Sequence, residues 1–298
     1  MKKETLTNIR IDKITTKEVL EKIKGFLLSD NQHYLITLNP EMVLEAQNNN
    51  HFKNIINQSD IVFADGTGIL WALDFLKRTK ESSFLGLWKK SQLEFLWKLL
   101  SIISILYNFV YTVINLLFNA KYRNNILQYK IPGIDLIYEI CRLDIIENQR
   151  IFLLGAEEGV ARKAALQLKE AFPNINIVGA EEGIIRNQKS DINNQELFRH
   201  INKTKPNILL VAFGAPKQEI WISENLKTIP SVKLAIGVGG SFDFISGKIK
   251  RAPQFLRKLG LEWVWRLILE PKRIIRIYNA TVKFSFLILK KALSKLQD

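Results

Sequence analysis

Short apolar runs of strand length alternate with helical patterns along most of this chain, and this alternation limits the fold more than any other feature. The apolar runs lie at residues 34–38, 60–64, 150–154, 175–178, 207–213 and 232–238. Between them apolar residues recur at helical spacing, as after the capping-box sequence Thr15 to Glu18. Strands that alternate with helices form right-handed βαβ units. We therefore expect an α/β fold with a mostly parallel sheet and helices on both faces.

Two segments depart from the alternation and carry the positive charge. The chain has 43 Lys and Arg against 29 Asp and Glu, a formal net charge of +14. Residues 76–130 hold 9 basic and 2 acidic residues, and residues 247–298 hold 13 and 3, so the remainder is slightly acidic. We expect an α/β core over residues 1–246, a hydrophobic helical insert at residues 80–128 and a basic helical appendage at residues 247–298.

The insert contains 22 consecutive uncharged residues, 99–120, about the length that crosses a hydrocarbon core of ~30 Å. Its polar residues recur about every 3.6 positions, as one narrow helical stripe. They are Glu94, Lys98, Ser101, Ser104, Asn108, Thr112, Asn115 and Asn119. The polar edge should face protein, water or headgroups, and the broad apolar face is suited to lipid. Three interpretations stay open: a helix in the plane of a membrane, a membrane span, and a helix buried in a protein or oligomer interface.

Residue usage favours a cytoplasmic protein at an anionic membrane surface. The single Cys141 excludes a disulfide framework, and the polar N-terminus lacks the apolar core of a signal peptide. In residues 272–296 basic and aliphatic residues are interleaved, which suits a helix on anionic lipid better than a nucleic-acid arm. A solvated helix edge is the alternative. We expect no nucleic acid partner, and attachment to the cytoplasmic face of the plasma membrane, peripheral or through the helix at residues 93–120.

Polar residues and glycines follow the predicted strands, where ligands bind in parallel sheets. Asp65 follows a strand and precedes Gly66. A carboxylate there can take a proton from a hydroxyl nucleophile, although Asp before Gly is also a common turn former. Glycine turns follow three later strands at Gly155, Gly214 and Gly237. Because glycine lets backbone approach a phosphate closely, the three turns together favour a nucleotide-ligand site.

The sequence contains no Asp-x-Asp, the usual carboxylate pair for a divalent ion on a nucleotide-sugar diphosphate. Its three histidines are far apart and form no metal-binding pattern. The charge of a leaving diphosphate would then be met by Lys, Arg and backbone N–H groups. We expect no metal site and no cofactor.

Six stretches together resemble the WecG/TagA/CpsF family of bacterial glycosyltransferases. They are Thr37–Glu41, Asp60–Gly68, Pro132–Asp135, Phe152–Ala165, Gly214–Trp221 and Gly237–Leu267. The last of them, GVGGSFDFISGKIKRAPQFLRKLGLEWVWRL, is long and specific. The resemblance covers nearly all of the chain except about residues 80–128, and the hydrophobic insert is not part of the family's usual pattern.

The resemblance implies a Rossmann-like core and an inverting, metal-independent transfer from a UDP-activated sugar, N-acetylmannosamine or its uronic acid. The acceptor would be a sugar on an undecaprenyl diphosphate carrier. By motif position, Asp65 is the expected catalytic base, with Thr37 and Asn39 beside it. Expected contacts to the donor and its diphosphate are Gly66, Lys130, Gly155, Gly214, Lys217, Gln218, Gly239, Asp243, Arg251, Arg266, Arg273 and Arg276. The four arginines belong to the appendage, which in the family closes over the active site and touches the membrane.

Lys130 stands where the family usually has Arg, and Lys keeps the charge but loses the bidentate fork. The identities of the two sugars, their linkage and a homo-oligomeric state are also undetermined. The alternative function is a catalytically silent scaffold that recruits polysaccharide enzymes to the membrane, and UDP binding would distinguish it from an enzyme.

Overall fold

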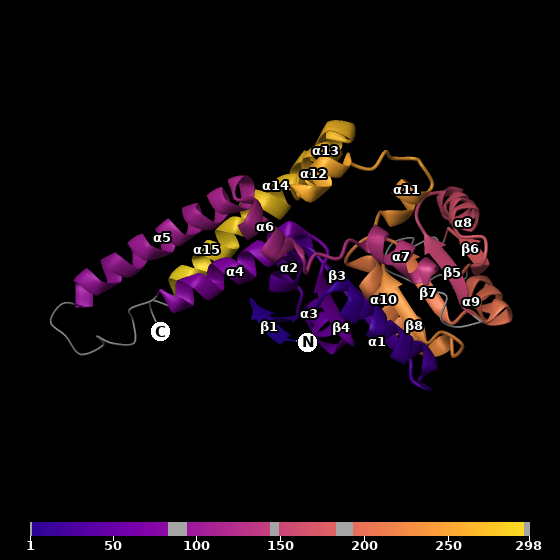
Figure 1. Cartoon of the computed structure of the whole chain (residues 1–298). Helices are drawn as coiled ribbons and strands as arrows, with labels where there is room; N and C mark the ends of the chain where they lie inside the picture. Colours follow the sequence, from indigo (N-terminus) through magenta and orange to yellow (C-terminus); the bar gives the residue numbers. More distant parts are fainter. Residues whose placement is uncertain (1, 83–93, 144–148, 183–192, 295–298) are drawn as a thin grey trace.

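A six-stranded parallel sheet forms the centre of the molecule (Figure 1). The computed structural model describes residues 2–82, 94–143, 149–182 and 193–294. The strand order is β4-β3-β8-β7-β5-β6. The strands are β3 (His33–Leu38), β4 (Ile61–Ala64), β5 (Arg150–Gly155), β6 (Asn176–Glu181), β7 (Ile208–Ala212) and β8 (Leu234–Gly237). The predicted α/β class and the predicted strands are confirmed.

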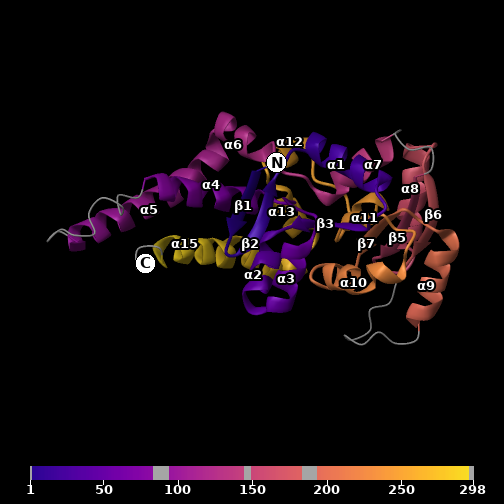
Figure 2. The ribbon, with the colours of Figure 1, turned by 90° about the horizontal axis from the view of Figure 1, so that it is seen from below.

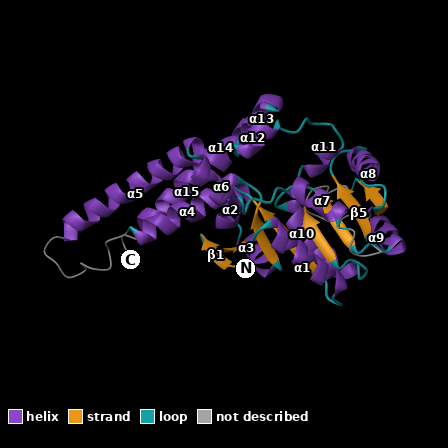
Figure 3. Ribbon diagram, viewed as in Figure 1, coloured by secondary structure: helices purple, strands orange, loops and turns teal. Residues whose placement is uncertain are grey.

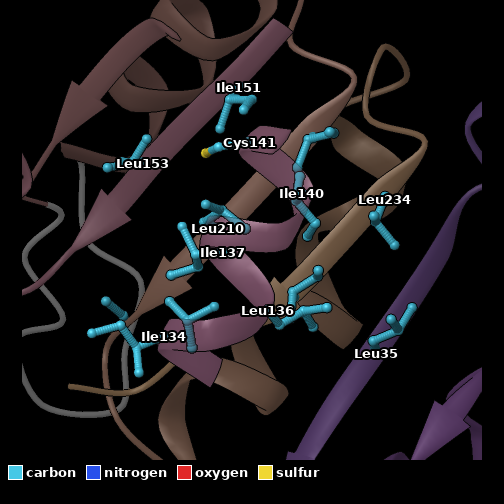
Figure 4. Close-up of a cluster of buried hydrophobic side chains, with 14 of the residues drawn as sticks. Leu35, Ile134, Leu136, Ile137, Ile140, Cys141, Ile151, Leu153, Leu210 and Leu234 are labelled. Atoms are coloured by element: carbon cyan, nitrogen blue, oxygen red, sulfur yellow. The ribbon is translucent and has the colours of Figure 1, made fainter. Parts of the chain in front are cut away.

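Helices cover both faces of this sheet (Figure 3). On one face lie α1 (Thr16–Leu28), α7 (Gly133–Arg142), α8 (Val160–Ala171) and α11 (Ser241–Ile245). On the other lie α2 (Pro40–Asn48), α3 (Asn50–Gln58), α4 (Thr67–Glu81), α9 (Asn193–Thr204) and α10 (Lys217–Asn225), with a 3-10 turn at Leu226–Thr228. Alternate strand residues serve the two faces: Leu153 and Leu210 pack with α7 (Figure 4), whereas Phe152 and Leu209 pack with α10.

The local signals at helix starts are confirmed. Thr15 and Glu18 form the expected capping box at the start of α1. Asn39 caps α2, with Pro40 in its first turn, so β3 is followed at once by a helix. The helix expected over residues 133–146 is described as far as Arg142, and residues 144–148 lie outside the described residues.

A hairpin at the N-terminus was not predicted. Strands β1 (Lys2–Leu6) and β2 (Ile9–Lys13) pair antiparallel across Thr7 and Asn8, both of which have positive φ. The buried carboxylate of Asp12 accepts a hydrogen bond from the backbone N–H of Val62 in β4 (2.9 Å). The hairpin therefore protects an edge of the parallel sheet that would otherwise present unpaired backbone groups.

Helix α5 (Glu94–Phe118) projects from the sheet together with α4 and α15 (Phe284–Ser294) as an arm (Figures 1 and 2). The middle of its polar stripe faces inward: Thr112 Oγ1 accepts from Trp71 Nε1 (3.1 Å), and Asn108 Nδ2 donates to Ser82 Oγ (2.9 Å). Its apolar face is open, with Phe95 and Phe118 81% and 82% exposed. The predicted separation of polar and apolar faces is confirmed. Residues 83–93, which begin the expected insert, lie outside the described residues. Helix α6 (Ala120–Leu127) lies directly after α5.

The basic appendage contains two short helices followed by one long helical stretch. It forms α12 (Gln254–Lys258), α13 (Glu262–Leu269), a 3-10 turn at Pro271–Arg273 and α14 (Ile274–Tyr278). A π-helical turn at Asn279–Lys283 then leads into α15. Phe284 and Ile288 of α15 are buried against the α2–α4 side of the core. The helix predicted over residues 272–296 is therefore confirmed as far as Ser294, with a π-helical turn inside it, and part of its apolar surface is used in packing.

Candidate active site

Five loops meet at the carboxyl edge of the sheet. All described strands of the sheet are parallel, so the loops after β3, β4, β5, β7 and β8 leave from the same side. Strands β3 and β8 lie side by side, which brings the N-terminal pair β3–β4 against the four later strands. Ligands of open parallel sheets bind at such a reversal of strand order. The predicted site residues after these strands therefore share one edge.

Asp65 lies at this edge directly after β4, and its side chain is held by a distant partner. Its Oδ1 accepts from the backbone N–H of Gly133 at the start of α7 (2.9 Å), and its own N–H donates to the Leu38 carbonyl (3.0 Å). The interpretation of Asp65 as a local turn former does not account for this long-range contact. Burial raises the pKa of the carboxyl, while the Gly133 hydrogen bond and the charge of Lys130 lower it.

Thr37 and Asn39 lie on the neighbouring strand exit, and both take part in contacts within the fold. Thr37 is buried, and its Oγ1 donates to the carbonyl of Gly237 (2.9 Å), which ties β3 to β8. Asn39 Oδ1 accepts from the N–H of Met42 (3.1 Å) as the cap of α2. Their direct participation in chemistry stays a prediction.

Glycines allow the close approaches at this edge. Gly155 has φ +106°, and a Cβ there would lie 2.8 Å from the carbonyl carbon of Ala212. Gly66 is the cap residue of α4 and supplies no capping side chain, so the first N–H groups of that helix lie beside Asp65 without such a cap. Lys217 is exposed at the start of α10. Both features are suited to an anionic ligand.

Gln218 differs from the expected donor contact because its amide is engaged inside the fold. The side chain is 2% exposed, and its Oε1 accepts from the N–H groups of Gly214 (3.2 Å) and Gly239 (3.0 Å). Its Nε2 donates to Oε1 of Glu219 (2.7 Å). Sequence reasoning missed Glu219, which is 1% exposed and whose pKa burial raises to about 7. A charged residue in the first turn of a helix gives no signal of such burial.

Five of the six basic residues expected at the diphosphate pair with a carboxylate. Lys130 pairs with Glu262, Arg251 with Asp135 (2.7 Å), Arg266 with Glu270 (2.9 Å), Arg273 with Glu270 (2.8 Å) and Arg276 with Glu41 (2.8 Å). The Lys130–Glu262 pair connects α13 to the segment before α7, and the Arg276–Glu41 pair connects α14 to the first turn of α2. The appendage is therefore docked on the core through ion pairs.

Arg266 of the appendage lies beside the glycine turn after β8. A Cβ on Gly240 would lie 2.8 Å from Arg266 Nη2, and the guanidinium lies 4.9 Å from the ring centroid of Phe244. Burial lowers its pKa, and Nη2 has no hydrogen-bond partner among the described residues. Asp243 of α11, the helix that follows this turn, has Oδ1 3.5 Å from Lys248 Nζ. The turn thus has a guanidinium with an unused donor beside it.

The described residues contain no group of three or more His, Cys, Asp and Glu side chains that could hold a metal ion. Within the same residues, one helix, Phe95–Phe118, is long and apolar enough to cross a membrane by length and composition, and 22% of its most apolar stretch is buried. The chemistry-bearing residues and the apolar helix lie in different parts of the molecule, the sheet edge and the arm (Figure 1).

The model of the WecG/TagA/CpsF family of glycosyl transferases matches residues 4–100 and 110–298. The chain belongs to this family. A relative from Staphylococcus aureus strain MRSA252, named N-acetylglucosaminyldiphosphoundecaprenol N-acetyl-beta-D-mannosaminyltransferase, is 29% identical over 282 residues, 94% of this chain and 90% of the relative. Proteins of the same name from strains NCTC 8325 / PS 47 and COL match with the same identity and coverage.

Membership of the WecG/TagA/CpsF family makes the chain an enzyme of the glycosyltransferase class. It also corrects one expectation about the insert. The family match extends through residue 100 and resumes at residue 110, so most of the segment at residues 80–128 belongs to the family pattern. The segment is hard to recognise as part of the family because many different apolar residues can occupy the apolar face of a helix. Few of its positions therefore require a particular residue.

Proposed function

We propose that this glycosyltransferase moves a hexosamine-type sugar, N-acetylmannosamine or a close relative, from a UDP-sugar to a sugar on a polyprenyl diphosphate. The product would serve the synthesis of a bacterial surface polysaccharide. The name of the S. aureus relatives supports this choice, since it specifies N-acetylmannosaminyl transfer to an N-acetylglucosaminyl diphosphoundecaprenol. The observation that carries the proposal is the Asp65 carboxyl, which lies at the ligand edge of the sheet and has a raised pKa.

In this proposal Asp65 acts as the general base. Its carboxylate takes the proton from the acceptor hydroxyl as that oxygen attacks the anomeric carbon, and UDP leaves from the opposite side, which inverts the configuration. A carboxylate with a raised pKa is a stronger base than an ordinary one. Because the base must be ionised, turnover should fall as the pH drops through the pKa of Asp65, which lies above its ordinary value of 3.8. A pH–rate profile measures this directly.

The leaving diphosphate would be stabilised by cations of this chain without a divalent metal. Arg266 has an unused Nη2 beside the glycine turn after β8, and Lys217 is exposed at the start of α10. Lys130, Arg251, Arg273 and Arg276 would exchange their carboxylate partners for phosphate oxygens when the donor binds. Charge-assisted hydrogen bonds of this kind provide much of the transition-state stabilisation in group transfer.

We further propose that the open face of α5 lies in the cytoplasmic leaflet of the plasma membrane. Thr112 and Asn108 of its inner stripe form hydrogen bonds with Trp71 of α4 and with Ser82 after it. The outer face presents Ile103, Tyr107 and Val110, each more than half exposed. The appendage adds exposed apolar residues among its basic ones, such as Trp263 and Ile275. Such surfaces bind anionic bilayers through apolar burial plus charge attraction.

A donor and acceptor screen tests the reaction. Purified protein is mixed with UDP-sugars and a synthetic N-acetylglucosaminyl diphosphate lipid, with and without a metal chelator, and the product is analysed by mass spectrometry and NMR. We expect transfer from UDP-N-acetylmannosamine or a related donor, an inverted anomeric configuration and no loss with the chelator. A retained configuration or a chelator-sensitive rate would contradict the proposed mechanism, and an absence of transfer from every UDP-sugar would contradict the proposed donor.

A further inference from the structure

Two buried residues of α10 join the glycine turns that follow β7 and β8. Gln218 Oε1 accepts from the N–H groups of Gly214 (3.2 Å) and Gly239 (3.0 Å). The Nε2 of the same amide donates to Oε1 of Glu219 (2.7 Å). One amide therefore holds both turns, and one carboxyl group holds that amide.

The side chains of Gln218 and Glu219 fit against the end of β8 only because Gly237 has no Cβ. A Cβ on Gly237 would lie 2.6 Å from Gln218 Nε2 and 2.9 Å from Glu219 Oε1, closer than real Cβ contacts. The carbonyl of Gly237 also accepts a hydrogen bond from the hydroxyl of Thr37, so the end of β3 is held at the end of β8. The pair thus lies where three strand exits of the candidate active site converge.

The partners of Gln218 require one orientation of its amide. The oxygen and the NH₂ group of a side-chain amide have nearly the same shape, so their positions are assigned by their hydrogen-bond partners. Gly214 and Gly239 both offer donors, and Glu219 offers an acceptor on the other side. A reversed amide would place a donor against two donors and an oxygen against a carboxyl oxygen. Glu219 therefore selects the orientation in which Gln218 can hold both turns.

We infer that Glu219 is a positioning residue of this glycosyltransferase, which acts through Gln218 to fix the turns at Gly214 and Gly239 in the geometry that binds the donor. Glu219 does not touch the substrate in this account, because its side chain is 1% exposed. The effect on donor binding rests on the proposed function. The effect on the two turns does not, and can be measured without substrate.

Two substitutions separate the hydrogen bond from simple burial. Glu219→Leu replaces the carboxyl with an apolar side chain of similar size and removes the acceptor for Gln218 Nε2. We expect a rise of about tenfold in the donor KM and in the Kd of UDP, with kcat changed by less than about twofold. Glu219→Gln keeps an oxygen for Gln218 and should restore both constants to near the wild-type values. Glu224→Leu, on the same helix but 59% exposed, is the control and should change neither.

A double-mutant cycle tests whether Glu219 acts through Gln218. In a Gln218→Leu background, Glu219→Leu should cause no further change in the Kd of UDP measured by calorimetry, because residues that act as one unit are not additive. Additive losses would overturn the inference, and so would a Glu219→Gln variant as defective as Glu219→Leu.

Hydrogen exchange tests the positioning role without any substrate. The amides of Gly214 and Gly239 should exchange faster in Glu219→Leu, and at wild-type rates in Glu219→Gln and Glu224→Leu. Unchanged exchange in Glu219→Leu would show that Glu219 does not hold the turns. If the wild-type protein transferred no sugar, the proposed function would fail while the exchange result still decided the positioning role.

Discussion

The sheet edge and the arm use apolar and polar residues in opposite ways. Around the sheet, apolar side chains fill both faces, and charged groups such as Asp65 and Arg266 gather where the strands end. In α5 the polar residues Asn108 and Thr112 are buried, whereas apolar residues such as Ile103 and Val110 are exposed. A helix that turned its apolar face outward would be unfavourable in water, so this face indicates a non-aqueous contact. If the proposed function holds, the difference assigns chemistry and membrane attachment to separate parts of the chain.

The largest expected effect is at the sheet edge. Asp65→Asn removes the base but keeps an oxygen for the Gly133 N–H, so the fold should be unchanged while kcat falls by about 10²- to 10⁴-fold. Binding to anionic vesicles should stay at the wild-type level. The measurements are steady-state transfer, UDP calorimetry and vesicle sedimentation. Near-normal turnover in a folded variant would exclude Asp65 as the base.

A second substitution at the sheet edge tests whether Arg266 stabilises the leaving diphosphate. Arg266→Ala removes the guanidinium beside Gly240 and should lower kcat by about 10²-fold, with transfer kinetics as the readout. Arg142→Ala, whose guanidinium pairs with Glu139 on the outside of α7, is the matched control and should leave transfer unchanged. Equal losses in both variants would show that the effect comes from net charge rather than from the position of Arg266.

The arm should respond to charge on its open face. Ile103→Glu together with Val110→Glu should weaken binding to anionic vesicles by about tenfold, because each charge opposes insertion of the apolar face. Leu28→Glu together with Leu166→Glu places the same charges on exposed leucines of α1 and α8 in the body and is the control. If both pairs weakened binding alike, general charge repulsion rather than α5 would explain attachment.

The smallest expected effect concerns the inner stripe of α5. Thr112→Val leaves Trp71 Nε1 without its acceptor and should lower the free energy of unfolding by about 1 kcal/mol in a urea titration. Vesicle binding should not change, since Thr112 is buried. A variant with wild-type stability but weaker vesicle binding would contradict the assigned inward and outward faces.

Local signals in the sequence predicted much of the fold. The Thr15–Glu18 capping box, the Asn39–Pro40 helix start and the apolar strands all have local causes, and the structure confirms them. The stripe on α5 was also predictable, because helical periodicity depends on one segment alone. The N-terminal hairpin was missed because Asp12 is stabilised by a partner 50 residues away, the N–H of Val62.

The candidate site was predicted in location but not in its contacts. Glycine turns and Asp65 are recognisable because strand ends gather at one edge, and all of them lie there. The sequence gives no indication that Gln218 holds Gly214 and Gly239, nor that Glu219 is buried beside it. These contacts depend on how α10 docks between turns from different strands, which no local pattern encodes.

The separate roles of the sheet edge and the arm can be tested with the ratio of turnover on a soluble acceptor to turnover on a membrane-bound one. Turnover of the Ile103→Glu, Val110→Glu variant is measured on a short, water-soluble acceptor and on a long-chain polyprenyl acceptor in anionic vesicles. We predict wild-type turnover on the soluble acceptor and a loss of about tenfold on the vesicle-bound one. Equal losses on both acceptors would contradict the account, because they would show that the open face of α5 supports the chemistry itself rather than access to the membrane.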